Sequence, residues 1–309
     1  MALQKEIMSS RARLLKLATY SSVCVAILLI AIKAVVWFMS GSVSILASLV
    51  DSLMDAGASV LNLLAVRLAL QPADHEHRFG HGKAEGIAAL FQAAFIMGSA
   101  LFLMLNAIDR IRHPSELHIT PVVFAVMLAS LLITIALVAF QQWILKQVHS
   151  SAVAADRLHY LTDILSNIAV LIALGVSLYG WHQADAIIGI GLALWIGWSA
   201  IGIGHEALNM LMDKALPDTD LAAINSAVLQ TTGVLGMHDL RTRLSGETHI
   251  IQCHIEVQDN LPLLQAHDIA VAAEHNIAAL FDDSEIIIHL DPLSVVNTHT
   301  TTDTQGCLS

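Results

Sequence analysis

The chain has 309 residues, of which 56% are hydrophobic and only 13% are charged, whereas about a quarter of the residues of a typical soluble domain are charged. This composition excludes a soluble globular protein and predicts a polytopic membrane protein. The formal net charge of −11 argues against nucleic acid as a partner, because phosphate binding needs a basic surface.

Six apolar segments follow one another along the chain, each long enough to cross a bilayer, which takes about 20 residues. They cover residues 14–39, 43–69, 86–108, 119–145, 152–180 and 184–210. Ten Lys and Arg residues flank one side of these spans, and two, Arg110 and Arg112, flank the other. By the positive-inside rule, both termini are expected in the cytoplasm.

The N-terminal segment and the cysteines indicate how the chain is processed. The segment lacks the short apolar core and the cleavage site of a secretory signal, so the first span is expected to stay in the mature protein. Cys24, Cys253 and Cys307 are widely spaced and form no C-x-x-C pair, so we interpret them as free thiols in a reducing compartment. Lys33 lies inside the first span, and we expect it to reach an interface or pair with an acid rather than act in transport.

The second span carries two acids in the sequence S-L-V-D-S-L-M-D-A-G. Asp51 and Asp55 are four residues apart, so they share one face of a helix. Single polar residues in a membrane helix commonly bond a neighbouring helix. Two carboxylates on one face are costly to place in hydrocarbon, and this pattern favours a functional site.

The loop after the second span contains Asp74, His77 and His81, spaced by three and four residues. Carboxylate and imidazole together are a zinc-type ligand set. A solvated His-rich loop is the alternative. We predict a weak, exchangeable metal site, because Gly residues make the loop adaptable.

The fifth span repeats the i, i+4 spacing with His159 and Asp163 in H-Y-L-T-D. If this face meets the face of Asp51 and Asp55, the four side chains form a metal cage. The first pair is expected nearer the outer half of its span and the second nearer the cytoplasmic half. The cage therefore requires that the two pairs reach one depth.

A small soluble domain follows the sixth span. The pattern predicts a helix from Asp218 to about Gln230, capped by Asp218 to Asp220, then two strands joined at S-G-E, a helix from Leu263 to about Phe281 and a last strand. The expected fold is a six-helix transmembrane bundle over residues 1–212 and a two-layer α-β-β-α-β domain over residues 213–293, with a disordered tail over 294–309.

This soluble domain contains a further set of possible ligands, namely His238, His254, His267, His289 and Asp291. His289 and Asp291 share one face of the last strand because side chains alternate along a strand, and the helix with His267 could cover that face. Scattered surface histidines are the alternative. We predict a metal cluster, with two ions that share Asp291 as one possibility.

The motifs D-S-L-M-D, F-G-H-G-K-A-E and H-Y-L-T-D, together with the soluble domain, resemble the cation diffusion facilitator family, in particular its bacterial YiiP-type zinc transporters. The resemblance implies a homodimer in the inner membrane that exports Zn²⁺ and related divalent ions in exchange for protons. It implies a transport site at Asp51, Asp55, His159 and Asp163, a loop site at Asp74, His77 and His81, and a cytoplasmic dimer site at His238, His254, His267, His289 and Asp291. It also implies an ion pair between Lys83 and Asp213.

The ligand chemistry is consistent with a metal/proton exchanger rather than an enzyme. Ligands bind metal in their deprotonated form, so protonation expels the metal, and His159 is the best single proton carrier. An intramembrane metalloenzyme would need a general base such as Glu, and the only Glu within a span is Glu206, near the end of the sixth. A metal sensor does not explain the buried acids. The ion itself and an importing direction stay open.

Overall fold

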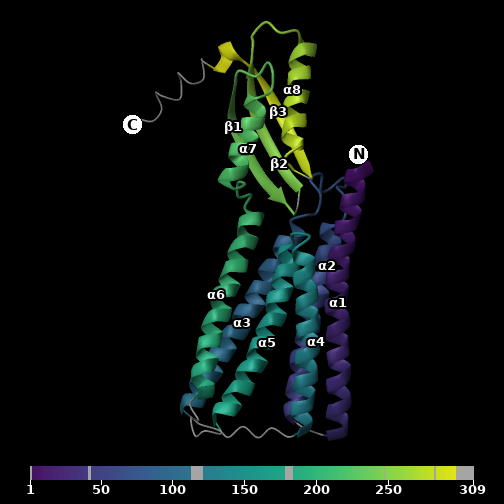
Figure 1. Cartoon of the computed structure of the whole chain (residues 1–309), viewed down its shortest axis with the longest axis vertical. Helices are drawn as coiled ribbons and strands as arrows, with labels where there is room; N and C mark the ends of the chain where they lie inside the picture. The colour runs from purple at the N-terminus through teal and green to yellow at the C-terminus, as the bar shows by residue number, and fades with distance from the viewer. Residues whose placement is uncertain are drawn as a thin grey trace. The chain divides into compact units, whose positions relative to one another are not determined.

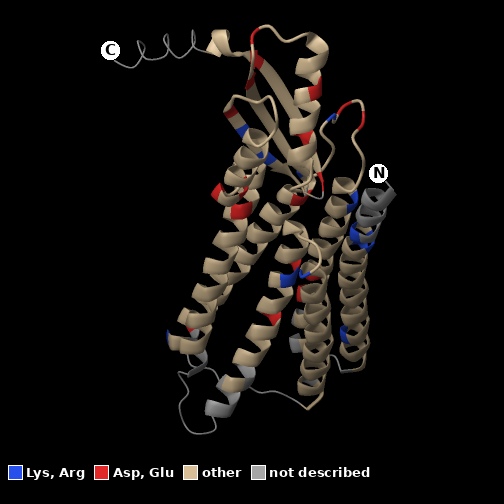
Figure 2. Cartoon of the chain, turned by 45° about the horizontal axis from the view of Figure 1, so that its top comes forward, with Lys and Arg blue, Asp and Glu red and all other residues tan. Residues whose placement is uncertain are grey.

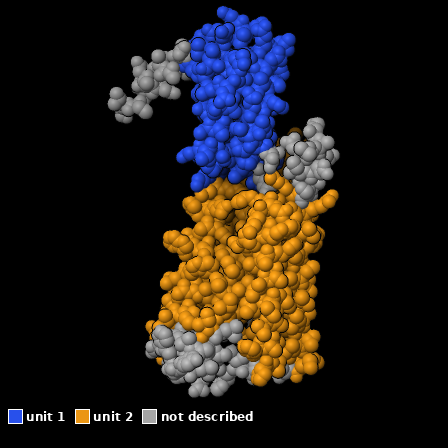
Figure 3. Space-filling view, in the orientation of Figure 1, with its two compact units in different colours: residues 1, 212–309 blue, residues 2–211 orange. Residues whose placement is uncertain are grey.

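The computed structural model describes residues 2–40, 43–112, 121–177, 184–246, 248–281 and 283–296. The chain divides into two compact units, one over residues 2–211 and one from Met212 onward (Figure 3). The division falls where the apolar helices end and the mixed composition of the soluble domain begins. Each unit has its own core.

The first unit is a bundle of six long helices within the described residues. They are α1 (Ala2–Ser40), α2 (Val43–Ala69), α3 (Ala84–Arg112), α4 (Pro121–Leu145), α5 (Ser151–Ser177) and α6 (Ala184–Leu211). All except α5 meet the length and hydropathy of a membrane span over their described residues, and α5 packs against α2, α3, α4 and α6. The N-terminal end of α1 and the C-terminal end of α6 lie at the same end of the bundle (Figure 1). The predicted six-helix bundle is confirmed.

The outside of the bundle is apolar. Phe38 and Trp198 are 88% and 79% exposed, which would be costly in water and is expected where lipid surrounds the helices. Lys, Arg, Asp and Glu are sparse along these helices (Figure 2). The few charged groups within the bundle therefore need a separate explanation.

The second unit has the predicted α-β-β-α-β order. Its elements are α7 (Asp218–Leu229), β1 (Gly236–Ser245), β2 (Thr248–Val257), α8 (Leu263–Ala278) and β3 (Ser284–Pro292). The sheet order is β1-β2-β3, with β1 antiparallel and β3 parallel to β2. A parallel neighbour needs a crossover connection, and α8 supplies it.

The ends of two predicted elements differ from the expectation. Pro217 is the N-cap of α7 and no side chain caps the helix, whereas Asp218 and Asp220 lie in its first turn, where the helix dipole favours negative charge. The predicted tail begins with a helical turn at residues 293–296, and the rest of it, with Cys307, lies outside the described residues.

The two faces of the sheet differ in character. Ile251, Cys253 and Ile255 of β2 point into a core formed with α7 and α8. Burial raises the pKa of the Cys253 thiol to about 11, so it stays protonated and is a core residue rather than a metal ligand. Because side chains alternate, His254 and Glu256 point to the opposite face. The fold thus separates the hydrophobic core from the face that carries histidine.

We predict that Ile255→Ala lowers the free energy of unfolding of the soluble unit by about 2–5 kcal/mol, because Ile255 is completely buried and the substitution leaves a cavity. Urea unfolding of the separately expressed unit measures this. The matched control is Ile287→Ala on β3, where the side chain is 46% exposed, and the expected cost is about 1 kcal/mol or less. Equal losses for the two variants would contradict the assignment of the core face.

Candidate metal sites

A cavity of about 690 Å³ lies within the helical bundle and brings ionisable residues of three helices to one space. It is lined by Lys33 of α1, by Asp51 and Asp55 of α2, and by His159 and Asp163 of α5. Helices α3 and α4 add apolar and hydroxyl side chains, among the described residues. The polar faces predicted on the second and fifth spans therefore face a common space.

Three of the four predicted transport ligands meet in this cavity. The His159 Nε2 atom lies 3.0 Å from Asp55 Oδ1, and one ligand atom each of Asp55, His159 and Asp163 lies within 4.8 Å of the others. His159 is buried, and its ring packs edge-on against Phe95. One imidazole and two carboxylates at this spacing can hold a divalent cation. The contact also brings Asp55 of the first pair to the depth of the second pair.

Asp51 lines the same cavity but is not part of this group. It lies one turn before Asp55, its side chain is exposed, and its carboxylate is not among the atoms that converge. Zinc in proteins prefers four ligands. The remaining position beside the three converging groups is therefore available to Asp51 or to a water molecule, and the role of Asp51 as a ligand stays a prediction.

Lys33 is held inside the cavity. Its Nζ atom donates hydrogen bonds to Ser52 Oγ at 2.7 Å and to the Ser48 carbonyl oxygen at 3.1 Å. Lys33 was expected to reach an interface or to pair with an acid. Two acceptors on α2 hold its ammonium in the cavity that Asp51, Asp55 and Asp163 also line. An ammonium has no lone pair and cannot bind metal. It places a fixed positive charge beside the candidate ligands.

The loop site is assembled around Asp74. Asp74 Oδ2 lies 3.4 Å from His81 Nε2, and Asp74 Oδ1 lies 3.5 Å from His77 Nδ1. The backbone N–H of His77 donates to Asp74 Oδ1 at 2.6 Å, and this bond lowers the pKa of the Asp74 carboxyl, which is therefore ionised at neutral pH. Asp74 and His77 are exposed. Such an arrangement fits a site that exchanges its ion easily.

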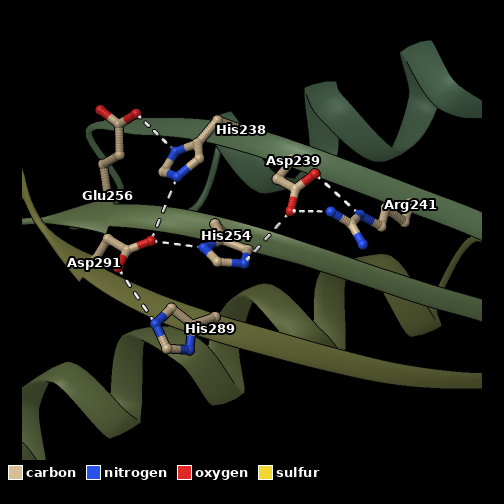
Figure 4. A network of polar contacts seen from close by, with 7 residues as sticks. All are labelled: His238, Asp239, Arg241, His254, Glu256, His289 and Asp291. Atoms are coloured by element: carbon tan, nitrogen blue, oxygen red, sulfur yellow. Dashed lines mark hydrogen bonds and ion pairs between the residues drawn. The ribbon is translucent and has the colours of Figure 1, made fainter. Parts of the chain in front are cut away.

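The soluble unit brings ligands from all three strands to one face of the sheet (Figure 4). His238, His254 and His289 are neighbours across β1, β2 and β3. Asp291 Oδ2 lies 2.7 Å from His254 Nδ1 and 3.4 Å from His238 Nε2, while Asp291 Oδ1 lies 3.3 Å from His289 Nε2. The donor atoms of His238, His254 and Asp291 fit zinc. Asp291 faces histidines with both oxygens, as a bridging carboxylate would.

His267 is not brought to this group. It is exposed on α8, and α8 packs on the other face of the sheet through Ala273 and Ile277. Its role as a ligand stays a prediction. Glu256 was not predicted as a site residue, but its Oε1 atom lies 3.1 Å from His238 Nδ1 and can orient that ring. The alternation of side chains along a strand could have identified Glu256, because it is two residues from His254 on the same strand face.

Lys83 and Asp213 belong to different units, so their predicted ion pair stays a prediction. Within its own unit, Lys83 donates a hydrogen bond to the Leu211 carbonyl oxygen at 3.4 Å. Asp213 lies 3.3 Å from the Arg243 guanidinium.

Comparisons with known proteins match most of the chain. The family described as the cation efflux transmembrane domain matches residues 19–212, and the cation efflux protein cytoplasmic domain matches residues 216–293. The cation-efflux pump FieF of Klebsiella pneumoniae subsp. pneumoniae is 50% identical over 287 residues, which are 93% of this chain and 96% of that protein. The FieF pump of Cronobacter sakazakii is 51% identical over 92% of this chain and 95% of its own length. A solved zinc form of CzrB is 26% identical and covers 26% of this chain and 94% of its own, with a TM-score of 0.25.

We predict that His254→Ala weakens zinc binding to the separately expressed soluble unit on the order of 100-fold, because it removes the central imidazole of the group. Isothermal titration calorimetry measures the dissociation constant. The matched control is His275→Ala, which removes an exposed histidine in the last turn of α8, and zinc affinity should then be unchanged. Equal effects of the two substitutions would show that the sheet face does not hold the ion.

Proposed function

Because this chain belongs to the cation efflux family, the cation diffusion facilitators, we propose that it exports Zn²⁺, with Fe²⁺ and Cd²⁺ as further substrates, in exchange for protons. The chain is a multi-pass bacterial membrane protein that moves divalent cations outward, and it is a transporter rather than the metalloenzyme considered above. The observation that carries the proposal is the convergence of Asp55, His159 and Asp163 in one cavity within the helical bundle.

Proton exchange follows from the way these side chains bind metal. Carboxylates and imidazole coordinate a cation only when they are deprotonated, so protons and the metal compete for the same lone pairs. When the cavity faces the cytoplasm, metal entry displaces protons. When it faces the outside, protons displace the metal. Imidazole and carboxylate together suit Zn²⁺ and Fe²⁺ better than Mg²⁺ or Ca²⁺, which favours a borderline transition metal as the substrate.

The soluble unit supports a regulatory role in a homodimer. The His-bearing face of its sheet is not covered by α7 or α8, which pack on the other face. We infer that a second copy covers it and that Zn²⁺ held by His238, His254 and Asp291 stabilises that contact.

Both termini then lie in the cytoplasm of a protein in the inner membrane, on the side that carries ten of the basic residues counted above.

We predict that Asp55→Ala reduces zinc-driven proton flux into proteoliposomes on the order of 100-fold, because it removes the carboxylate that contacts His159. A pH-sensitive dye inside the vesicles and a zinc dye measure the two fluxes in parallel, with Zn²⁺, Fe²⁺, Cd²⁺ and Mn²⁺ as substrates. The control Asp220→Ala alters an acid in α7, away from the cavity, and should transport normally. Native transport by the Asp55 variant would overturn the assignment of the site.

A second prediction concerns the fixed charge in the cavity. Lys33→Met should bind zinc more tightly in the transmembrane site, by about tenfold, because it removes a positive charge that repels the cation. Turnover should fall, because release becomes slower. Lys33→Arg keeps the charge and should bind zinc with nearly native affinity. Weaker binding by the Met variant would indicate that Lys33 only supports the fold.

A further inference from the structure

A further acid, apart from the three in the cavity, is buried in the bundle one helical turn before His159. Asp156 of α5 is completely buried, as are Ser22 of α1 and Gln141 of α4, which contact it. Asp156 is not among the described residues that line the metal cavity. The metal site described above therefore gives it no role.

The groups that hydrogen-bond to Asp156 are neutral. Ser22 Oγ lies 2.6 Å and Gln141 Nε2 lies 2.7 Å from Asp156 Oδ2. Helix α2 contributes Ser59, and the ionisable group whose charge acts on Asp156 is His159 of its own helix. A buried carboxylate whose hydrogen-bond partners are neutral costs several kcal/mol relative to water, a cost that a bound proton removes.

The hydrogen bonds at Asp156 Oδ2 suit both states of the acid, while the buried Oδ1 has no hydrogen-bond partner among the described residues. In the protonated state, Asp156 donates to Ser22 Oγ, and Ser22 in turn donates to the Ala18 carbonyl oxygen at 3.1 Å. The two N–H groups of Gln141 then donate to Ser22 Oγ at 2.9 Å and to Asp156 Oδ2. In the ionised state, the Ser22 hydroxyl rotates and donates to Asp156 instead. One hydroxyl rotation thus accommodates the gain or loss of a proton without any change in packing.

Asp156 is also linked to the metal cavity. Tyr160, one turn after it, lines that cavity. The Tyr160 hydroxyl lies 2.8 Å from Ser59 Oγ and donates to the Ser22 carbonyl oxygen at 3.4 Å. A divalent cation in the cavity favours the ionised form of a nearby carboxyl, whereas an empty cavity with three carboxylates favours the neutral form. The charge of the cavity and the protonation of Asp156 are therefore coupled.

We propose that Asp156 is a proton-binding site distinct from the metal ligands, which releases its proton when a divalent cation occupies the cavity and regains it when the cation leaves. This inference rests on the proposed exchange of metal for protons and adds a proton carrier to it. The proton leaves as H⁺ to solvent, and the carboxylate remains bonded to Ser22 and Gln141.

The test is the number of protons released when zinc binds to purified full-length protein in weakly buffered solution. The background carries Asp74→Ala and His254→Ala, so that the transmembrane site dominates the signal. In this background Asp156→Asn should bind zinc with an affinity within about threefold and release about one proton fewer per ion. The control Asp220→Asn should release the native number. An unchanged count in the Asp156 variant would overturn the proposal.

Infrared difference spectra of metal-free and zinc-loaded protein give a second readout, which does not require the Asp156 variant to fold. The C=O band of a protonated carboxylic acid should disappear when zinc binds. Ser22→Ala removes the group that accepts the hydrogen bond of the protonated acid, so this band should shift in frequency. The shift would be specific to Asp156, because the carboxyls of Asp51, Asp55 and Asp163 have no contact with Ser22 among the described residues. An unmoved band would place the proton elsewhere and refute the proposal. Absence of proton release and of zinc-coupled proton flux in the unmodified protein would instead refute the exchange itself.

Discussion

The constraint on which this structure depends is the cost of placing charge in a low-dielectric interior. Three carboxylates and an ammonium share one cavity among apolar helices, and none would be tolerated there without a partner. The bundle meets this cost by giving these groups polar partners, with Lys33 held by Ser48 and Ser52 and with His159 in contact with Asp55. A divalent cation completes the balance. With Lys33 charged and His159 neutral, one divalent cation offsets the two negative charges that remain on the three carboxylates.

Helix α5 is central because it presents polar groups in two directions. His159 and Asp163 point into the cavity shared with α2, while Asp156 points toward α1 and α4. Tyr160 touches both regions. Because these residues lie within two turns of one rigid helix, a rotation of α5 that opens the metal site to one side would also alter the surroundings of Asp156. Metal and proton binding can thus be coupled through the movement of one element.

Much of the fold could be predicted because helices and strands follow from the periodicity of apolar residues over short stretches of sequence. Long apolar runs predict the helices, alternation predicts the strands, and spacing of three or four predicts which residues share a face. The orientation of one element against another is not local. For this reason the hydrogen bonds of Lys33 to α2 were not predicted, and His267, expected above the histidines of the sheet, lies on a helix that covers the opposite face. The partnership of Asp156 with Gln141 depends on the same non-local packing.

The three groups of candidate ligands use the same donor types but differ in burial, and this difference suggests different uses. Asp74 and His77 are exposed to water, His238 and His254 are half-buried at the surface of a sheet, and His159 is enclosed. Imidazole and carboxylate coordinate similar ions in all three places, so ligand type alone does not separate their functions. The exposure of a site to water determines how strongly the site resists hydration of its ion and how quickly the ion exchanges with solution. A loop open to water, a half-buried sheet face and a cavity within the bundle therefore present the same donor types to solvent to different degrees.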